Sequence, residues 1–305
     1  MNSDAELQKN MDEVLDAVIL AGGRGSRMLP GSSYVPKEIM PLVDTPILNH
    51  LIWEACKASV KRIHIVISPR KRSILNKILI NDNNYWGDEI RTDLPRISLH
   101  PLPKGVEIII HEQVNPGGVG DAILLAAETI NNPFLVLLGD NLLIKDHIGP
   151  QKSGPEFASD SSKKIVEYFY KNGISCAGIL EVPNKDVGKY GIVRLEGDLI
   201  KEIIEKPDPK DAPSNFILCG RYLLPGNSNE LLKLYPSSEY GELQSIVFFN
   251  HLITNGGFGS VDMNEFVLYD SGDPINWLKS QVDHALRRDD IKNEFRDWII
   301  NKLKK

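Results

Sequence analysis

Residues Asp16–Pro46 constrain the fold of this chain more than any other segment. The run Asp16–Ala21 is apolar after its first residue and shows no polar alternation, which predicts a strand buried on both faces of a sheet. The loop Gly22–Arg27 follows, and its glycines let backbone N–H groups approach a ligand closely. Arg27 and Lys37 add positive charge. Together these features predict a cradle for several phosphates, and therefore a protein that handles nucleotides.

The loop does not match two common phosphate-binding motifs. A P-loop requires Gly-Lys followed by Ser or Thr, and no such sequence lies near this strand. A dinucleotide fingerprint counted from Gly23 requires a third glycine where this chain has Met28. Taken alone, the loop is also compatible with a tight turn and a solvated Arg27. Other motifs must decide between these interpretations.

The size and charge of the chain exclude several classes of protein. With 305 residues, it is long enough for one large α/β domain or one domain with an appendage. A net charge of −6 provides no general attraction for nucleic acid, so phosphate binding must come from locally placed basic residues. The cysteines Cys56, Cys176 and Cys219 are far apart in the sequence and indicate neither a disulfide framework nor a zinc site.

Nothing in the sequence indicates secretion or a membrane. The segment Met1–Glu13 is polar and lacks the apolar stretch of a secretory signal. No apolar run reaches the length of a membrane span. We therefore expect a soluble, cytoplasmic protein with neither a membrane nor a nucleic acid as its partner.

The first half of the chain alternates short apolar strands with amphipathic helices. This order requires crossover connections and predicts an α/β fold with a parallel sheet covered on both faces. In such sheets ligands bind outside the carboxyl ends of the strands, so the glycine-rich loop and Gly139-Asp140 are expected to meet at one cleft. The predicted strands are Asp16–Ala21, Ile63–Ile67, Val106–His111 and Phe134–Leu138, and the predicted helices are Ile47–Ser59 and Gly120–Thr129.

The second half of the chain has a different pattern. The segment Gln151–Lys164 is polar and rich in Ser and Lys, which predicts a surface loop or a lid-like insert. Strands are expected at Ser175–Val182 and Phe216–Leu224, and a hairpin between them turns at Glu196–Asp198. Residues Asp273–Lys305 predict a mostly helical tail.

Two aspartates follow apolar runs and are candidate metal ligands. Asp140 is the last residue of the segment FLVLLGD. Asp270 follows the apolar run FVLY in the segment FVLYDSGDP. Magnesium takes one or two protein carboxylates and fills its other positions with phosphate and water, so this pair beside a phosphate cradle suits Mg²⁺. Each aspartate alone is also typical of a turn or cap, although Asp273 fits the cap of the following helix better.

Two further groups are candidates for substrate contacts. Glu205 and Lys206 end a predicted strand before a proline; the lysine can bind a phosphate and the glutamate can accept hydrogen bonds from hydroxyls. By itself such a pair is typical of solvated surface. Gln113 follows another strand, and its amide can bind the edge of a base, next to Gly118 in the glycine-rich start of a helix. Most such glycines only begin a helix.

The order of these motifs is typical of a known family. From Asp16 to about Trp298 the chain contains AGGRGSRMLP, VPKEIMPLVDTPIL, GVGDAI, LLGD, KYGIVRL, EKP, APSNFILCGRYLL and GELQSI. It resembles the sugar-1-phosphate nucleotidyltransferases, most closely the bacterial-type UTP–glucose-1-phosphate uridylyltransferases, or UDP-glucose pyrophosphorylases. The segments MLP, PKEIMPLVDTP and APSNFILCGRY favour the uridylyl over the thymidylyl branch.

The resemblance implies a fold and a reaction. The fold is a Rossmann-like nucleotidyltransferase fold with a mixed, mostly parallel sheet flanked by helices, a small hairpin insertion and a helical C-terminal tail. It implies a catalytic domain over residues 14–272 and a tail over 273–305. The reaction is transfer of a uridylyl group from UTP to glucose 1-phosphate, with Mg²⁺ and release of pyrophosphate. By analogy alone, the family implies a homodimer or homotetramer.

The resemblance also assigns roles to individual residues. Phosphate binding and catalysis are implied for three basic side chains, substrate binding for eight positions and metal binding for two carboxylates. The catalytic residues are Arg27, Lys37 and Lys206; the substrate-binding residues are Ala21, Gly22, Gly23, Gln113, Gly118, Gly191, Glu205 and Lys206; the metal ligands are Asp140 and Asp270.

Two positions depart from the uridylyl pattern. Gly117 stands where that branch usually has lysine, and Asp121 where it usually has histidine. Both positions border the predicted pocket for the base and ribose. The sequence therefore does not decide which nucleotide and which hexose 1-phosphate the protein uses. A thymidylyltransferase, a uridylyltransferase for another hexose 1-phosphate and a non-catalytic regulatory subunit that binds sugar nucleotides are the alternatives.

Overall fold

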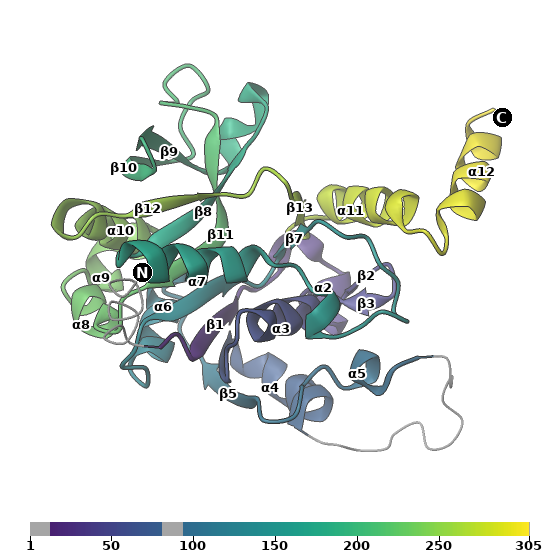
Figure 1. Ribbon diagram of the computed structural model, residues 1–305, viewed down its shortest axis with the longest axis horizontal. Coiled ribbons are helices and arrows are strands. Elements are labelled where there is room, and N and C mark those ends of the chain that lie inside the picture. Colours follow the sequence, from purple (N-terminus) through teal and green to yellow (C-terminus); the bar gives the residue numbers. More distant parts are fainter. Residues whose placement is uncertain (1–12, 81–93, 305) are drawn as a thin grey trace, which may run out of the picture.

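The protein forms a mixed β-sheet with helices on both faces (Figure 1). The computed structural model describes residues 13–80 and 94–304. Nearly all of the polar segment Met1–Glu13, on which the prediction of no secretory signal depended, lies outside these ranges. Within them, no helix combines the length and the apolar character that crossing a membrane requires.

The sheet has a parallel half that contains the strand before the glycine-rich loop. Strand β1 pairs in parallel with β4 on one side and with β6 on the other, and β5 extends the sheet beyond β4. The alternation of strands and helices predicted this arrangement. The bounds are β1 Asp16–Ala21, β4 Arg62–Ile67, β5 Glu107–Glu112 and β6 Phe134–Leu138.

In the other half of the sheet most strand pairs are antiparallel. The sheet is therefore mixed, as expected, and its parallel pairs lie mainly in the half that contains β1. Strand β11 runs antiparallel to β6 and β8, and β8 pairs in parallel with β12. The predicted hairpin is β9–β10; it adds to the same sheet through β12 and β11 rather than standing apart. The bounds are β8 Cys176–Glu181, β9 Gly191–Glu196, β10 Leu199–Glu205, β11 Phe216–Leu224 and β12 Gly259–Asp262.

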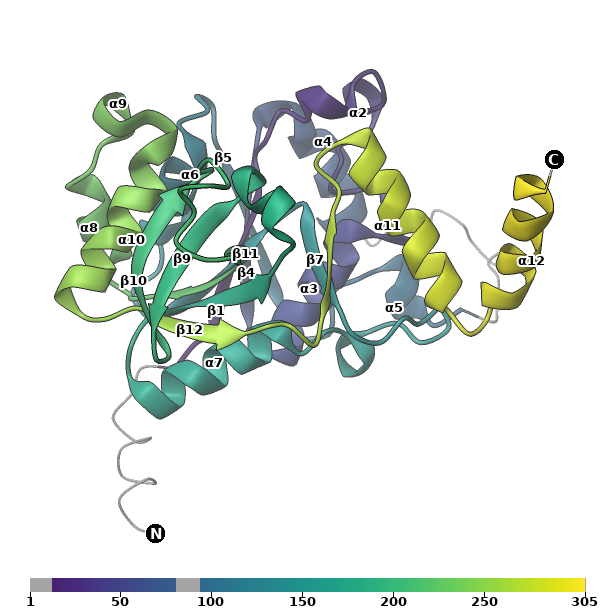
Figure 2. The same cartoon turned by 90° about the horizontal axis from the view of Figure 1, so that it is seen from above.

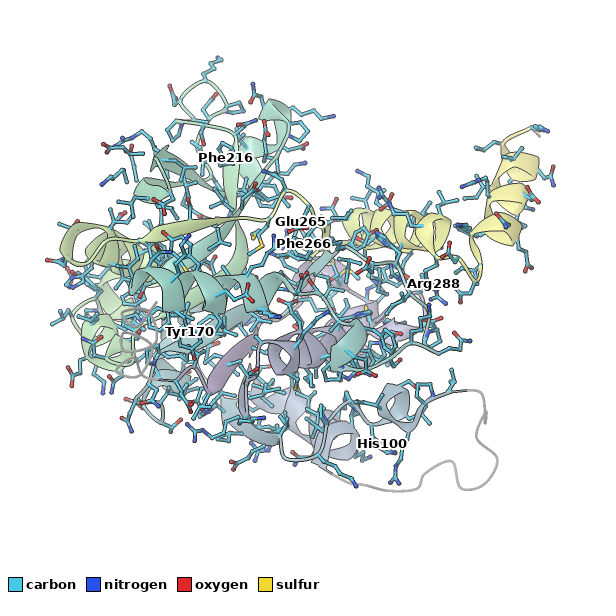
Figure 3. The ribbon with its side chains drawn as sticks, in the orientation of Figure 1. His100, Tyr170, Phe216, Glu265, Phe266 and Arg288 are labelled. Carbon is cyan, nitrogen blue, oxygen red and sulfur yellow. The ribbon has the colours of Figure 1, made fainter. Side chains whose placement is uncertain are left out.

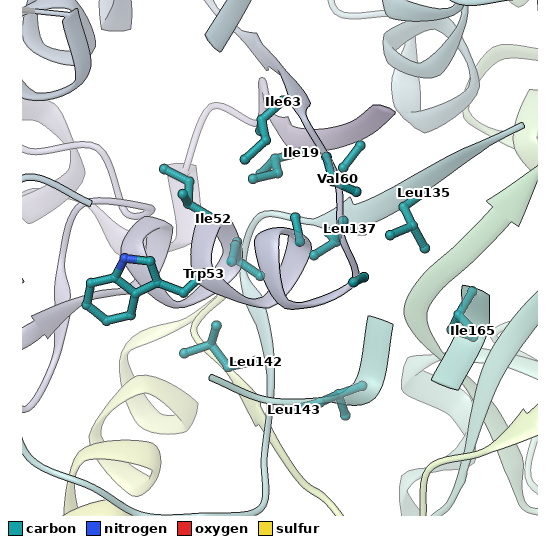
Figure 4. Close-up of a cluster of buried hydrophobic side chains, with 14 of the residues drawn as sticks. Ile19, Ile52, Trp53, Val60, Ile63, Leu135, Leu137, Leu142, Leu143 and Ile165 are labelled. Atoms are coloured by element: carbon teal, nitrogen blue, oxygen red, sulfur yellow. The ribbon is translucent and has the colours of Figure 1, made fainter. Parts of the chain in front are cut away.

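The hydrophobic core lies on both faces of the sheet because successive residues of a strand point to opposite sides. Ile19 of β1 packs in the cluster with helices α3 and α7, whereas Val18 packs in the cluster with α6, α8 and α10. Figure 4 shows Ile19 and Ile63 of the sheet beside Ile52 of α3. Burying one such side chain contributes about 2 kcal/mol. The helices are α3 Ile47–Lys57, α6 Gly118–Ala127, α7 Ser161–Asn172, α8 Ser228–Lys233 and α10 Gln244–Asn255.

The segment expected to be a surface loop is partly buried. Its last residues begin α7, and the hydroxyls of Ser161 and Ser162 donate to Oε1 of Glu54 at 2.7 and 2.5 Å. Arg221 of β11 donates to both oxygens of the same carboxylate at 2.6 and 2.9 Å. The prediction was wrong for these residues because their polarity serves a buried carboxylate and not the solvent.

The C-terminal tail is helical, as predicted. It consists of α11 Pro274–Arg287 and α12 Lys292–Leu303, and Asp273 caps α11 by accepting from the amides of Ile275 and Asn276. Arg288 lies just after α11 (Figure 3). Its guanidinium donates to Oδ2 of Asp44 at 2.7 Å. Figures 1 and 2 show α12 at the far end of α11, away from the sheet.

The remaining elements are short and lie mainly in connections. They are α2 Gly31–Tyr34, β2 Pro41–Leu42, β3 Thr45–Pro46, α4 Arg72–Leu75, α5 Arg96–Leu99, β7 Asn141–Ile144, α9 Ser237–Tyr240 and β13 Val267–Asp270.

Candidate active site

The carboxyl ends of β1 and β6 bring the glycine-rich loop next to Asp140. The amide of Gly139 donates to the carbonyl of Leu20 at 3.0 Å. A Cβ on Gly139 would lie 2.4 Å from that carbonyl oxygen, so only glycine permits this approach. Asp140 follows at the edge of the sheet, and Nζ of Lys37 donates to its Oδ2 at 2.5 Å. The predicted phosphate-binding lysine and the predicted metal ligand are therefore in direct contact.

The two predicted metal ligands lie at the same place although 130 residues separate them in the sequence. Strands β7 and β13 pair antiparallel, with Asp270 opposite Asn141. Ser271 donates to the carbonyl of Asp140 from its amide at 3.0 Å and from its hydroxyl at 2.9 Å. This pairing holds the segments that carry Asp140 and Asp270 side by side.

Arg27, which belongs to the glycine-rich loop, lies near Asp270. Its Nη2 is 3.0 Å from the position that a Cβ on Gly272 would occupy, two residues after Asp270. Burial raises the pKa of Asp270, and the negative charge of Asp140 adds to the increase, while Arg27 and the Gly272 amide oppose it. The site therefore holds two carboxylates that repel each other and two cationic side chains beside them.

This donor set fits a hard divalent cation in part. Burial and the nearby charge of Asp140 raise the pKa of Asp270, so a cation beside the two carboxylates would offset that repulsion, and carboxylate oxygen is the ligand that Mg²⁺ prefers. Among residues 13–80 and 94–304, no group of three or more His, Cys, Asp or Glu side chains could hold a metal. A cation at Asp140 and Asp270 would need ligands from elsewhere, such as phosphate oxygens and water.

A buried lysine that sequence reasoning missed fastens the glycine-rich loop. Nζ of Lys71, which is 2% exposed, donates to the carbonyls of Ala21 and Gly23 at 2.5 and 2.9 Å. It also donates to Oε2 of Glu38 at 2.9 Å, next to Lys37 in the chain. Burial lowers the pKa of Lys71, and the charge of Glu38 opposes that shift. Its position just after β4, the neighbour of β1, is the signal that could have identified it.

The predicted base-binding residues form a second group. Oε1 of Gln113 lies 2.8 Å from the position that a Cβ on Gly22 would occupy. Nε2 of Gln113 donates to the carbonyl of Gly118 at 3.2 Å and to Oδ2 of Asp121 at 2.7 Å. Gln113 and Gly118, the two residues predicted to bind the base, are therefore in contact, and Gly22 and Asp121 lie beside them.

The predicted sugar-binding residues form a third group at the end of the hairpin. Gly191 of β9 pairs with Glu205 of β10, and a Cβ on Gly191 would lie 3.1 Å from Oε2 of Glu205. Lys206 adopts a φ of 46°, which is rare for a non-glycine residue, and its amide donates to the carbonyl of Tyr190 at 3.0 Å.

Tyr190 links this third group to the carboxylates. Burial raises the pKa of Tyr190, and the negative charge of Asp270 adds to the increase. The hairpin end therefore lies within electrostatic range of the site that contains Asp140 and Asp270.

Comparisons with known proteins agree with these features. The family model described as nucleotidyl transferase matches residues 16–266. A UTP–glucose-1-phosphate uridylyltransferase from Streptococcus pyogenes is 31% identical over 305 residues, covering 95% of each chain. The structure of a UDP-glucose pyrophosphorylase from Acinetobacter baumannii aligns with a TM-score of 0.80 at 26% identity, covering 95% of this chain and 99% of that one.

A further solved structure is similar over a slightly smaller part of the chain. It is a UDP-glucose pyrophosphorylase complexed with UDP-glucose, with a TM-score of 0.73 at 26% identity, covering 89% of this chain and 98% of that one. The resemblance inferred from the motifs is thereby confirmed, and this chain belongs to the nucleotidyl transferase family.

Proposed function

We propose that this protein transfers a uridylyl group from UTP to glucose 1-phosphate and releases pyrophosphate. A phosphate oxygen of the sugar phosphate attacks the α-phosphorus of UTP, a new phosphorus–oxygen bond forms, and the bond to the leaving pyrophosphate breaks. The attacking oxygen is already ionised, so the reaction needs neither a general base nor a covalent intermediate. Positioning and charge stabilisation then supply most of the rate.

The observation that carries this proposal is the cluster at the carboxyl ends of β1 and β6. It combines a glycine-rich loop, the ion pair of Lys37 with Asp140 at 2.5 Å and the nearby Asp270. A phosphate-rich nucleotide needs backbone amides and basic side chains, and both are present beside two carboxylates. A relative in sequence is named as a UTP–glucose-1-phosphate uridylyltransferase, and a solved structure with the same overall fold is named as a UDP-glucose pyrophosphorylase.

The basic residues have separate roles in this proposal. The amides of Gly22 and Gly23, after Ala21, bind the phosphates of UTP. Arg27 and Lys37 stabilise the departing pyrophosphate. The ammonium of Lys37, which bonds to Asp140, can exchange that carboxylate for a phosphate oxygen of the nucleotide.

The other predicted residues complete the site. Lys206 binds the phosphate of the sugar phosphate, Glu205 and Gly191 bind the sugar, and Gln113 and Gly118 bind the uracil. Asp140 and Asp270 are the residues that would hold Mg²⁺, which when bound supplies charge neutralisation between two anionic reactants.

Three wider properties belong to the same proposal. Residues 14–272 form the catalytic domain, and residues 273–305 form a helical tail. The protein works in the cytoplasm, as its three widely spaced cysteines suggest. It assembles as a homodimer or homotetramer by analogy with the family, which light scattering during size-exclusion chromatography would test.

The decisive experiment is a matrix of nucleotides and sugar phosphates. Pyrophosphate release is measured with UTP, dTTP, CTP, ATP and GTP, each with glucose 1-phosphate and with other hexose 1-phosphates, in the presence and absence of Mg²⁺. We expect the highest kcat/KM for UTP with glucose 1-phosphate and no turnover after Mg²⁺ is chelated. A preference for dTTP or another hexose would replace the substrate assignment. Absence of turnover with every pair would instead favour a regulatory, non-catalytic protein.

A further inference from the structure

The amide of Gln113 has only one orientation that satisfies its neighbours. Its Nε2 faces two oxygens, the carbonyl of Gly118 at 3.2 Å and Oδ2 of Asp121 at 2.7 Å. A carbonyl and a carboxylate accept hydrogen bonds and cannot donate them. Rotating the amide by half a turn would place Oε1 against both acceptors, in a residue that is only 9% exposed. The charged carboxylate of Asp121 contributes more to this orientation of the amide than the carbonyl of Gly118 does.

Oε1 of Gln113 is consequently the atom left to contact a ligand. It faces the glycine-rich loop, because a Cβ on Gly22 would lie 2.8 Å from it. The side chain therefore presents a hydrogen-bond acceptor, and not a donor, beside the start of the phosphate cradle.

Gly117 and Asp121 are coupled by their packing. A Cβ on Gly117 would lie 2.6 Å from Cγ and 2.9 Å from Oδ2 of Asp121. Any larger residue at position 117 must displace the carboxylate that holds Gln113. The absence of a side chain at position 117 thus leaves the space that the Asp121 carboxylate occupies.

We propose that Asp121 is a positioning residue that sets the base preference of this enzyme by locking Gln113 as an acceptor, which favours uracil or thymine over cytosine. The proposal deepens the proposed function and rests on its placement of the base against Gln113. Uracil and thymine carry a hydrogen on N3, whereas N3 of cytosine is itself an acceptor.

The test measures discrimination between UTP and CTP, because a merely structural role of Asp121 would not change their ratio. In Asp121→Ala the amide can turn and donate to cytosine. We expect the ratio of kcat/KM for UTP to that for CTP to fall by about tenfold or more, mainly through KM. Asp121→Asn, whose side-chain oxygen still accepts from Gln113, should retain most of the ratio. Glu128→Ala removes a carboxylate at the other end of α6 and serves as the matched control.

Gly117→Ala provides a second, independent perturbation. The backbone of Gly117 has a φ of −99°, so alanine adds no backbone strain, and its only expected effect is to displace Asp121. We expect it to lower the UTP/CTP ratio in the same direction as Asp121→Ala. The double variant should show no further loss, since both substitutions act through the same contact.

Binding measurements separate this inference from the reaction itself. Calorimetric titration with UTP and CTP reports the same ratio as an affinity difference, even for a protein without turnover. A wild-type ratio in both Asp121→Ala and Gly117→Ala would overturn the role of Asp121 and leave the uridylyltransferase proposal intact. Absence of turnover in the wild type would overturn the proposed reaction, while the binding ratio would still decide the role of Asp121.

Discussion

Nζ of Lys37 lies 2.5 Å from Oδ2 of Asp140, although 103 residues separate them in the sequence. Each side chain was selected from the sequence for a different reason, the lysine for phosphate and the aspartate for metal. Their contact means that the two proposed functions, phosphate binding and metal binding, would share one location, because the neighbouring strands β1 and β6 end side by side. The ammonium of Lys37 also balances the negative charge of Asp140 when no substrate phosphate is nearby.

Removing one of the paired carboxylates should affect turnover more than nucleotide binding. We expect Asp140→Asn and Asp270→Asn each to lower kcat by about 100-fold or more, because each removes charge from the cation site. The affinity for UTP, measured by calorimetry, should fall by less than kcat does.

The control for these variants is Asp297→Asn on the exposed α12, which should retain wild-type kinetics. If Asp140→Asn also showed wild-type kcat at limiting Mg²⁺, Asp140 would be removed from the metal site.

Lys71 should determine both the stability of the protein and the geometry of the phosphate loop. Lys71→Met leaves the buried carboxylate of Glu38 without its cation, so we expect unfolding free energy to fall by about 3–5 kcal/mol. The double variant with Glu38→Gln should recover much of that stability. It should not recover the KM for UTP, because the carbonyls of Ala21 and Gly23 still lack their donor.

Urea unfolding and UTP kinetics on the single and double variants distinguish these effects. Lys77→Met, at an exposed position a few residues later, is the control. Full recovery of KM in the double variant would show that Lys71 acts on stability alone.

Lys206 should show opposite effects on stability and activity. Its φ of 46° lies in the left-handed region, which costs a residue with a Cβ about 1 kcal/mol. Lys206→Gly should therefore be as stable as the wild type or slightly more stable, while the KM for glucose 1-phosphate rises at least about tenfold through loss of the charge.

Lys206→Ala separates the two contributions, because it loses the charge but retains the backbone strain. It should match Lys206→Gly in activity and be less stable by thermal unfolding. Lys210→Ala, also exposed, serves as the control. An unchanged KM in both variants would exclude Lys206 from the sugar-phosphate site.

Two histidines with lowered pKa values, His50 and His284, should make the protein less stable below neutral pH. His50 is partly buried near Asp44, Glu54 and Arg288, and burial lowers its pKa from 6.5 to about 4. Burial, together with His50, His147 and Arg288, lowers the pKa of His284 from 6.5 to about 3. The folded state therefore binds these protons less readily than the unfolded state.

The direction of the pH effect follows from that difference. Both histidines are neutral in either state above pH 6.5, so their contribution to stability is complete there. As the pH falls from 6.5 towards 4, the unfolded state gains protons first, and each histidine lowers the unfolding free energy by at most about 1.4 kcal/mol per pH unit. Urea unfolding between these pH values should give a smaller slope for His284→Asn than for the wild type or His100→Asn. Equal slopes would contradict this assignment.

Much of the fold could be predicted because burial leaves a strong pattern in the sequence. The strands Asp16–Ala21, Phe134–Leu138 and Phe216–Leu224 have the predicted bounds. Apolar runs bounded by glycine and polar residues leave few alternatives to a buried strand. Ser161 and Ser162 were misassigned because polarity alone does not distinguish a solvated hydroxyl from one that bonds to a buried carboxylate such as Glu54.

The sequence by itself determined the family and the candidate residues of the site. These candidates are the glycine-rich loop, Arg27, Lys37, Asp140, Lys206 and Asp270. Only the tertiary structure decided which of them touch. It placed Lys37 on Asp140, Lys71 under the loop, and Asp121 on Gln113 in the space left by Gly117. The physical reason is that these contacts join segments from different strands and helices, so their distances depend on how the sheet brings the strand ends together and not on spacing along the chain.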